Sequence, residues 1–74
     1  MTLSDLQPGS RCRIKKIRVR GIVGQRLRDM GFHPGIDVDV VRNAPLVDPV
    51  ELKLEGNFIS IRHQEAQGIE VEPL

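Results

Sequence analysis

The sequence predicts a small, mostly β domain, a barrel of about five to six short strands with one or two short helices. The first observation is length: 74 residues are too few for two independent cores, so residues 1–74 are expected to form a single domain. The second is that glycine and proline interrupt the chain at strand-sized intervals. The third is that apolar and polar residues alternate between these interruptions, and closing such strands into a barrel buries one face of each.

The first half of the chain is expected to hold one strand and one helix. Residues 11–17 alternate until Lys15-Lys16 breaks the period, which predicts a bulged strand. Its core-facing residues would be Cys12, Ile14 and Ile17. After it, Val23, Leu27 and Met30 recur at helical spacing, with Gly31 where a left-handed C-terminal residue is favoured. A helix of about two turns is expected there.

The second half is expected to supply the remaining strands, at residues 36–41, 50–55, 58–62 and 69–72. Gly56-Asn57 separates two alternating segments, which predicts a two-residue hairpin turn, because glycine tolerates the positive φ that such turns require. Both phenylalanines, Phe32 and Phe58, are assigned to core packing.

Composition limits the classes of function. Cys12 is the only cysteine, so no internal disulfide can form and a reducing compartment is favoured. The N-terminus lacks the features of a signal peptide, and no stretch reaches the length of a membrane span. We therefore expect a cytoplasmic protein that meets a membrane only through a partner. The absence of a nucleophile–base pattern or a phosphate-binding loop predicts that it is not an enzyme.

Charge is distributed unevenly along the chain. The formal net charge is +1, but residues 1–36 carry eight basic and two acidic side chains, and residues 37–74 carry three basic and eight acidic ones. One interpretation is a basic face that docks on an acidic protein or a phosphate surface. The other is that oppositely charged strands neutralise each other in the fold, the ordinary outcome for exposed strand faces.

Nucleic-acid and metal binding both have weak support from the residues. Base stacking needs aromatic side chains, and with no tryptophan or tyrosine we expect no nucleic-acid partner, although phosphate contacts through the Arg11 to Arg28 cluster stay an alternative. His63, Glu65 and the distant His33 offer the ligand types of an iron site, but their spacing does not show that they converge. No cofactor is expected, and Fe(II) carriage is a second alternative.

Residues 43–49 form the most informative segment, because two prolines should stiffen an exposed loop that also carries apolar side chains. Leu46 and Val47, next to Pro45, are the apolar residues of this loop. They could fold back over an open barrel end or serve a partner as an anchor. The residues alone leave both interpretations open.

Four motifs in register resemble the FeoA family of bacterial ferrous iron uptake proteins. They are Leu3-Ser4-Asp5-Leu6-x-Pro8-Gly9, Leu27-x-x-Met30-Gly31-Phe32-x-Pro34-Gly35, Ala44-Pro45-Leu46-x-Asp48-Pro49, and Ser60-Ile61-Arg62-x-x-Glu65-Ala66 followed by Ile69-Glu70-Val71. They cover nearly the whole chain. The family usually has glycine between the leucine and the aspartate of the loop, where this chain has Val47, so a stiffer and more apolar loop is expected.

The resemblance implies an SH3-like barrel and an accessory role beside FeoB, the membrane Fe(II) transporter with a cytosolic GTP-binding domain. The expected partner is the cytosolic part of FeoB. Candidate contacts are the loop residues Pro45, Leu46 and Val47 and the basic residues Arg13, Lys15 and Arg26. Weak self-association through an unpaired strand edge is left open.

Overall fold

The computed structural model describes residues 1–74 and contains five strands, two short α-helices and one 3₁₀ turn. In chain order the elements are η1 (Leu3–Asp5), β1 (Arg11–Ile17), α1 (Gly21–Asp29), β2 (Asp37–Arg42), β3 (Val50–Leu54), β4 (Asn57–Ile61), α2 (His63–Ala66) and β5 (Ile69–Pro73). The predicted fold class is confirmed: the protein is mostly β, and each expected strand is present within one or two residues of its predicted ends.

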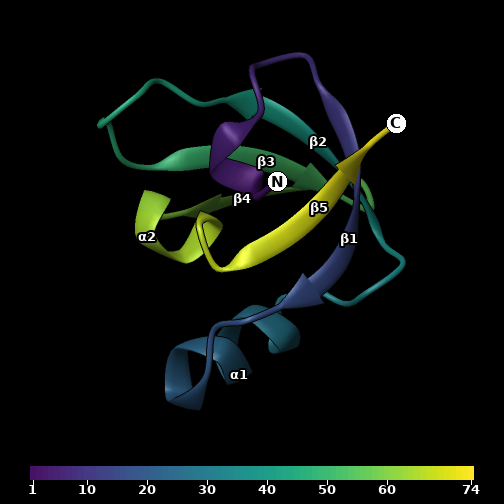
Figure 1. Ribbon diagram of the computed structural model, residues 1–74, viewed down its shortest axis with the longest axis vertical. Coiled ribbons are helices and arrows are strands. Elements are labelled where there is room, and N and C mark those ends of the chain that lie inside the picture. Colours follow the sequence, from purple (N-terminus) through teal and green to yellow (C-terminus); the bar gives the residue numbers. More distant parts are fainter.

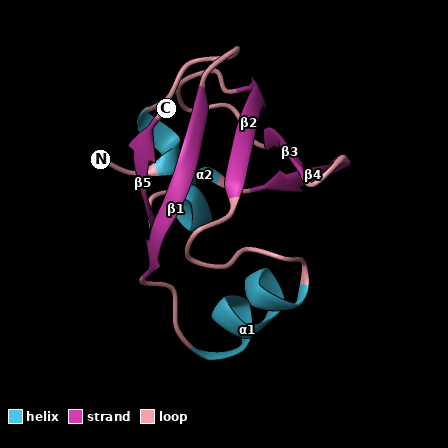
Figure 2. Ribbon diagram, turned by 90° about the vertical axis from the view of Figure 1, so that its right-hand side faces the viewer, coloured by secondary structure: helices cyan, strands magenta, loops and turns pink.

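All five strands belong to one antiparallel sheet with the order β4-β3-β2-β1-β5. The sheet curls around the core, so that β5 lies in front and β4 behind in Figure 1. Helix α1 lies beyond the ends of the strands, as Figure 2 shows, and α2 joins β4 to β5. None of the helices is long and apolar enough to cross a membrane.

Alternating strand patterns produce the core. Fifteen buried apolar residues form one cluster, and no polar or charged residue is buried. In β1, Cys12 and Ile14 are buried and Ile17 is half-buried. The register against β5 shifts between Ile14 and Lys16, which is the predicted bulge.

Helix α1 ends as its sequence predicts. Gly31 has φ +106°, its N–H bonds to the Arg28 carbonyl at 3.0 Å, and the Phe32 N–H bonds to the Leu27 carbonyl at 3.1 Å. This pair of bonds is the Schellman motif, which needs a left-handed residue that glycine adopts without strain. Of the predicted helix positions, Leu27 is fully buried, but Val23 is 38% exposed because it borders a groove described below.

The hairpin between β3 and β4 differs from the prediction by one residue. Its two-residue turn is Glu55-Gly56, and Asn57 is already in β4, opposite Leu54. Both turn residues have positive φ, +48° and +85°, as a type I′ turn requires. Because this turn matches the twist of the flanking strands, Glu55 adopts a left-handed conformation, one residue before the Gly56-Asn57 turn that was predicted.

The assignment of Phe58 to the core is wrong, whereas Phe32 is fully buried. Phe58 is 73% exposed and lies opposite Lys53, whose Nζ is 5.6 Å from the ring centroid. Successive strand residues point to opposite faces of the sheet. Ile61 is buried, and Phe58 lies three positions before it, an odd number, so the Phe58 side chain points to the opposite, outer face.

Candidate functional site

The loop between β2 and β3, residues 43–49, projects from the barrel at the left of Figure 1 and is called the β2–β3 loop below. The side chain of Leu46 is 100% exposed and Val47 is 56% exposed. These side chains therefore do not fold back over the barrel end, which removes one of the two interpretations of the loop.

A tight turn places Leu46 at the tip of this loop. The Val47 N–H donates to the Ala44 carbonyl at 3.1 Å, Pro45 is the second turn residue, and Leu46 is the third, with φ +61°. Proline second and a positive φ third are the signature of a type II turn. Glycine or asparagine is usual in that third position, so leucine occupies an unfavourable backbone conformation there.

The base of the loop is tied to the N-terminal segment. Asn43 Nδ2 donates to the Ser4 carbonyl at 3.0 Å and to the Leu6 carbonyl at 2.6 Å. A polar trough of about 590 Å³ lies beside the loop, lined by residues 4–8, by Asn43, Pro45 and Leu46, and by His63 and Gln67. The exposed leucine thus stands at the rim of a polar concavity.

His63 connects the loop to helix α2. Its Nε2 lies 2.9 Å from the carbonyl oxygens of both Ala44 and Val47, and its backbone N–H donates to Asp48 Oδ1 at 2.8 Å. Because carbonyl oxygens only accept hydrogen bonds, Nε2 carries the proton and donates to both. In this arrangement, Nε2 has no lone pair to offer a metal ion.

The three candidate metal ligands are not brought together. His33 lies in the connection between α1 and β2, whereas His63 is the first residue of α2. Both carboxylate oxygens of Glu65 already have partners within the protein: Oε1 accepts from the Arg62 backbone N–H at 2.9 Å, and Oε2 pairs with Arg26 at 3.1 Å. No group of three or more histidine, cysteine, aspartate or glutamate side chains in the chain is arranged to hold a metal ion.

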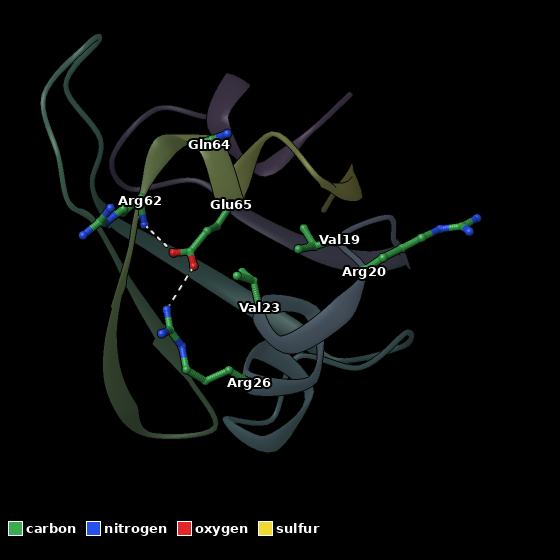
Figure 3. Close-up of a pocket in the computed structure, with 7 residues that line it drawn as sticks. All are labelled: Val19, Arg20, Val23, Arg26, Arg62, Gln64 and Glu65. Carbon is green, nitrogen blue, oxygen red and sulfur yellow. Dashed lines mark hydrogen bonds and ion pairs between the residues drawn. The ribbon is translucent and has the colours of Figure 1, made fainter.

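A second concavity, a groove of about 450 Å³, separates α1 from α2 (Figure 3). Val19 and Val23 provide its apolar surface, and the Glu65 side chain points into it from α2. The arginines that line it are Arg20, Arg26 and Arg62. Arg26 pairs with Glu65, whereas Arg20 and Arg62 have no carboxylate partner.

Most of the arginines in the basic half are paired with the acidic half. Arg13 Nε donates to Asp37 at 2.8 Å, and this hydrogen bond holds the pKa of the Asp37 carboxyl below its usual value. Arg18 pairs likewise with Glu70 at 2.8 Å, and this hydrogen bond lowers the pKa of the Glu70 carboxyl. The charge asymmetry of the sequence is therefore largely an internal neutralisation across the sheet.

The predicted basic contact residues do not form one face with the loop. Arg13 and Lys15 lie on β1, at the right of Figure 1, whereas the β2–β3 loop is at the left. Arg26 lies on α1, in the groove between the helices. Of the three, only Lys15 has no carboxylate partner.

The single cysteine is not placed for chemistry. Cys12 is fully buried, and this burial, with smaller contributions from Asp37 and Asp39, raises the pKa of its thiol from 9.0 to about 11. A thiol so protonated is a poor nucleophile at neutral pH, and Cys12 has the core-facing position that the strand pattern predicted.

Comparison with known proteins identifies the family. The model of the FeoA domain matches residues 1–73. The chain belongs to the FeoA family. A curated relative, the Fe(2+) transport protein A/Fe(2+) transporter FeoB fusion protein of Porphyromonas gingivalis, is 39% identical over 72 residues, which cover 97% of this chain. The chain spans only 8% of that much longer relative.

Solved FeoA structures have the same fold. The iron(II) transport protein A of Clostridium thermocellum, 43% identical, superposes over 100% of this chain and 46% of its own with a TM-score of 0.92. The FeoA of Stenotrophomonas maltophilia, solved in complex with zinc and described as an SH3 domain protein, is 25% identical with a TM-score of 0.86 over 97% of this chain and 89% of its own. The expected SH3-like fold is thus confirmed, and the family links the chain to ferrous iron transport.

In this FeoA-family chain, sequence patterns revealed the apolar loop but not what holds it. Asn43 and His63 had no recognised role in the loop, because their partners lie 16 to 39 residues away along the chain. The groove that Arg20 and Arg62 line was not predicted for the same reason: it exists only once α1 and α2 lie side by side. For the turn itself the sequence did hold a local signal: Pro45 is favoured at the second position of a type II turn.

Proposed function

We propose that this FeoA-family protein is a cytoplasmic, non-enzymatic accessory protein of ferrous iron uptake that docks on the cytosolic part of a FeoB-type transporter. The observation that carries the proposal is the fully exposed Leu46 at the tip of a braced turn. The FeoA–FeoB fusion in Porphyromonas gingivalis supports FeoB as the partner, because the two functions occur there in one polypeptide. The protein needs no cofactor of its own for this role.

The hydrogen-bonded turn lowers the conformational-entropy cost of binding through Leu46. An apolar side chain held in one place by a hydrogen-bonded turn loses little conformational freedom when a partner covers it. Burying a leucine side chain contributes about 1.5–3 kcal/mol, which corresponds to roughly 10- to 100-fold in affinity. Val47 and Pro45 extend the apolar contact around Leu46. The polar groups of the trough beside the loop would form the polar rim of the interface.

Basic residues are secondary contacts in this proposal. Lys15 and Arg26 lie on other sides of the barrel from the loop, so a partner that uses them together with Leu46 must wrap around the domain. Nucleic-acid binding has less support, because Arg11, Arg13, Arg18 and Arg26 are already paired with carboxylates.

The test is an NMR titration of the ¹⁵N-labelled protein with the cytosolic domain of its cognate transporter, with and without guanine nucleotide. We expect shifts centred on residues 44–48 and at least a tenfold weaker complex for Leu46→Asp. The matched control is Phe58→Asp, which places the same charge at another exposed apolar residue. Equal affinity of the folded Leu46→Asp variant and the wild type would refute the loop as the anchor.

A further inference from the structure

The β2–β3 loop has a shape that its own sequence does not favour. Leu46 is held at φ +61°, a conformation that costs a non-glycine residue energy, and its fully exposed side chain gains nothing from burial in return. A loop in this condition would relax to other conformations unless contacts from outside it held the turn closed.

His63 supplies the main contacts of this kind. Its ring N–H reaches the carbonyls of Ala44 and Val47, the first and last residues of the turn, at 2.9 Å each. In return, Asp48 Oδ1 of the loop accepts the backbone N–H of His63 at 2.8 Å. One side chain from α2 therefore bridges both ends of the turn that displays Leu46.

We infer that His63 is a positioning residue, which fixes the turn through Nε2 so that Leu46 is presented ready to bind. The effect on affinity rests on the proposed function, whereas the effect on loop order does not. The geometry also gives the imidazole a role that competes with metal ligation: a divalent ion on Nε2 would replace the proton that both carbonyls share.

The inference predicts that a side chain able to donate at the same reach can replace the imidazole. Glutamine carries an amide with two N–H groups at the end of a side chain of similar length, and it is a poor ligand for iron. Asparagine is too short to reach the two carbonyls, although it keeps the position polar. His63→Gln should therefore behave like the wild type, and His63→Ala and His63→Asn should not.

The experiment measures two quantities for each variant: the heteronuclear ¹⁵N NOE of Leu46 and Val47 in the free protein, and the affinity for the transporter's cytosolic domain by calorimetry. We expect lower NOE values and about tenfold weaker binding for His63→Ala and His63→Asn, and near-wild-type values for His63→Gln. The matched control is Gln64→Ala, the next residue of α2, which lines the groove and makes no hydrogen bond to the loop. If His63→Ala fails to fold, His63→Asn carries the test.

The outcomes separate the two proposals. Unchanged NOE values in His63→Asn, or a His63→Gln variant as disordered and weak as His63→Ala, would overturn the positioning role. A second outcome has three parts: the wild type binds, Leu46→Asp does not bind, and His63→Ala binds as well as the wild type. In that case the positioning role fails and the docking function stands. If the wild type does not bind the transporter domain, the docking function fails, and the NOE values still decide the role of His63.

Discussion

Replacing Leu46 with glycine should make the free protein more stable and its complex with the partner weaker. The two effects have opposite signs because the side chain is fully exposed in the free protein, while its backbone adopts φ +61°. Any substitution that acted through lost packing would lower both stability and binding.

The magnitude follows from the two backbone terms. Holding a non-glycine residue in the left-handed region costs roughly 1–2 kcal/mol, and glycine removes this cost. Glycine also gives the unfolded chain more freedom, which offsets about 0.5–1 kcal/mol of the gain. The net stabilisation is about 0.5–1 kcal/mol, equivalent to a rise in Tm of roughly 2–8 °C in a domain of this size.

Urea denaturation and thermal unfolding followed by circular dichroism measure the first effect, and calorimetric titration with the transporter's cytosolic domain measures the second. Leu46→Ala is the control, because it removes the same side chain without relieving the backbone: its affinity should fall like that of Leu46→Gly, and its stability should not rise. A Leu46→Gly variant that is less stable than the wild type would refute the idea that the turn is strained.

Two further predictions concern the barrel. Phe58→Ala should lower the free energy of unfolding by less than about 1 kcal/mol, since it loses an exposed contact with Lys53, whereas Phe32→Ala should cost about 3–5 kcal/mol; similar urea midpoints for the two variants would contradict the assignment of faces. The Cys12 thiol has a pKa of about 11 in the folded protein, against an ordinary value of 9.0. Between these two pH values the thiol ionises only in the unfolded chain. The stability that this thiol contributes is therefore fully present below pH 9 and falls as pH rises to about 11. Denaturation of the wild type and of Cys12→Ala across this range should show a steeper loss of unfolding free energy with pH for the wild type. The chain has no tyrosine that would titrate in the same range. Parallel plots of unfolding free energy against pH for the two proteins would argue against the raised pKa.

The strands and the core were largely predictable because a half-buried strand shows its burial in the alternation of its own residues. Cys12 and Ile14 in β1 were assigned correctly by this rule. Phe58 was misplaced because residue type was given more weight than its position in the alternation, and in β4 that position faces outward.

The site was predictable only in the part that is local in sequence. Prolines beside apolar residues indicated an exposed, stiff loop, and Leu46 is indeed its most exposed residue. The contacts that fix the loop come from residues that are remote in sequence, and no periodicity records them. His63 was considered as a metal ligand because its chemistry is readable from its type, whereas its hydrogen bonds to Ala44 and Val47 depend on where α2 lies in the fold.

The C-terminus leaves the barrel on the side away from the β2–β3 loop, as Figure 1 shows. The Leu74 N–H is bonded to the Arg11 carbonyl at 2.9 Å, so the end of the chain runs along β1 and does not turn back toward Leu46. A tether attached at this end would leave the tip of the loop unobstructed. Covalent linkage to a partner could then raise the effective concentration of the anchor by the length and stiffness of the tether alone, with no change in the docking surface.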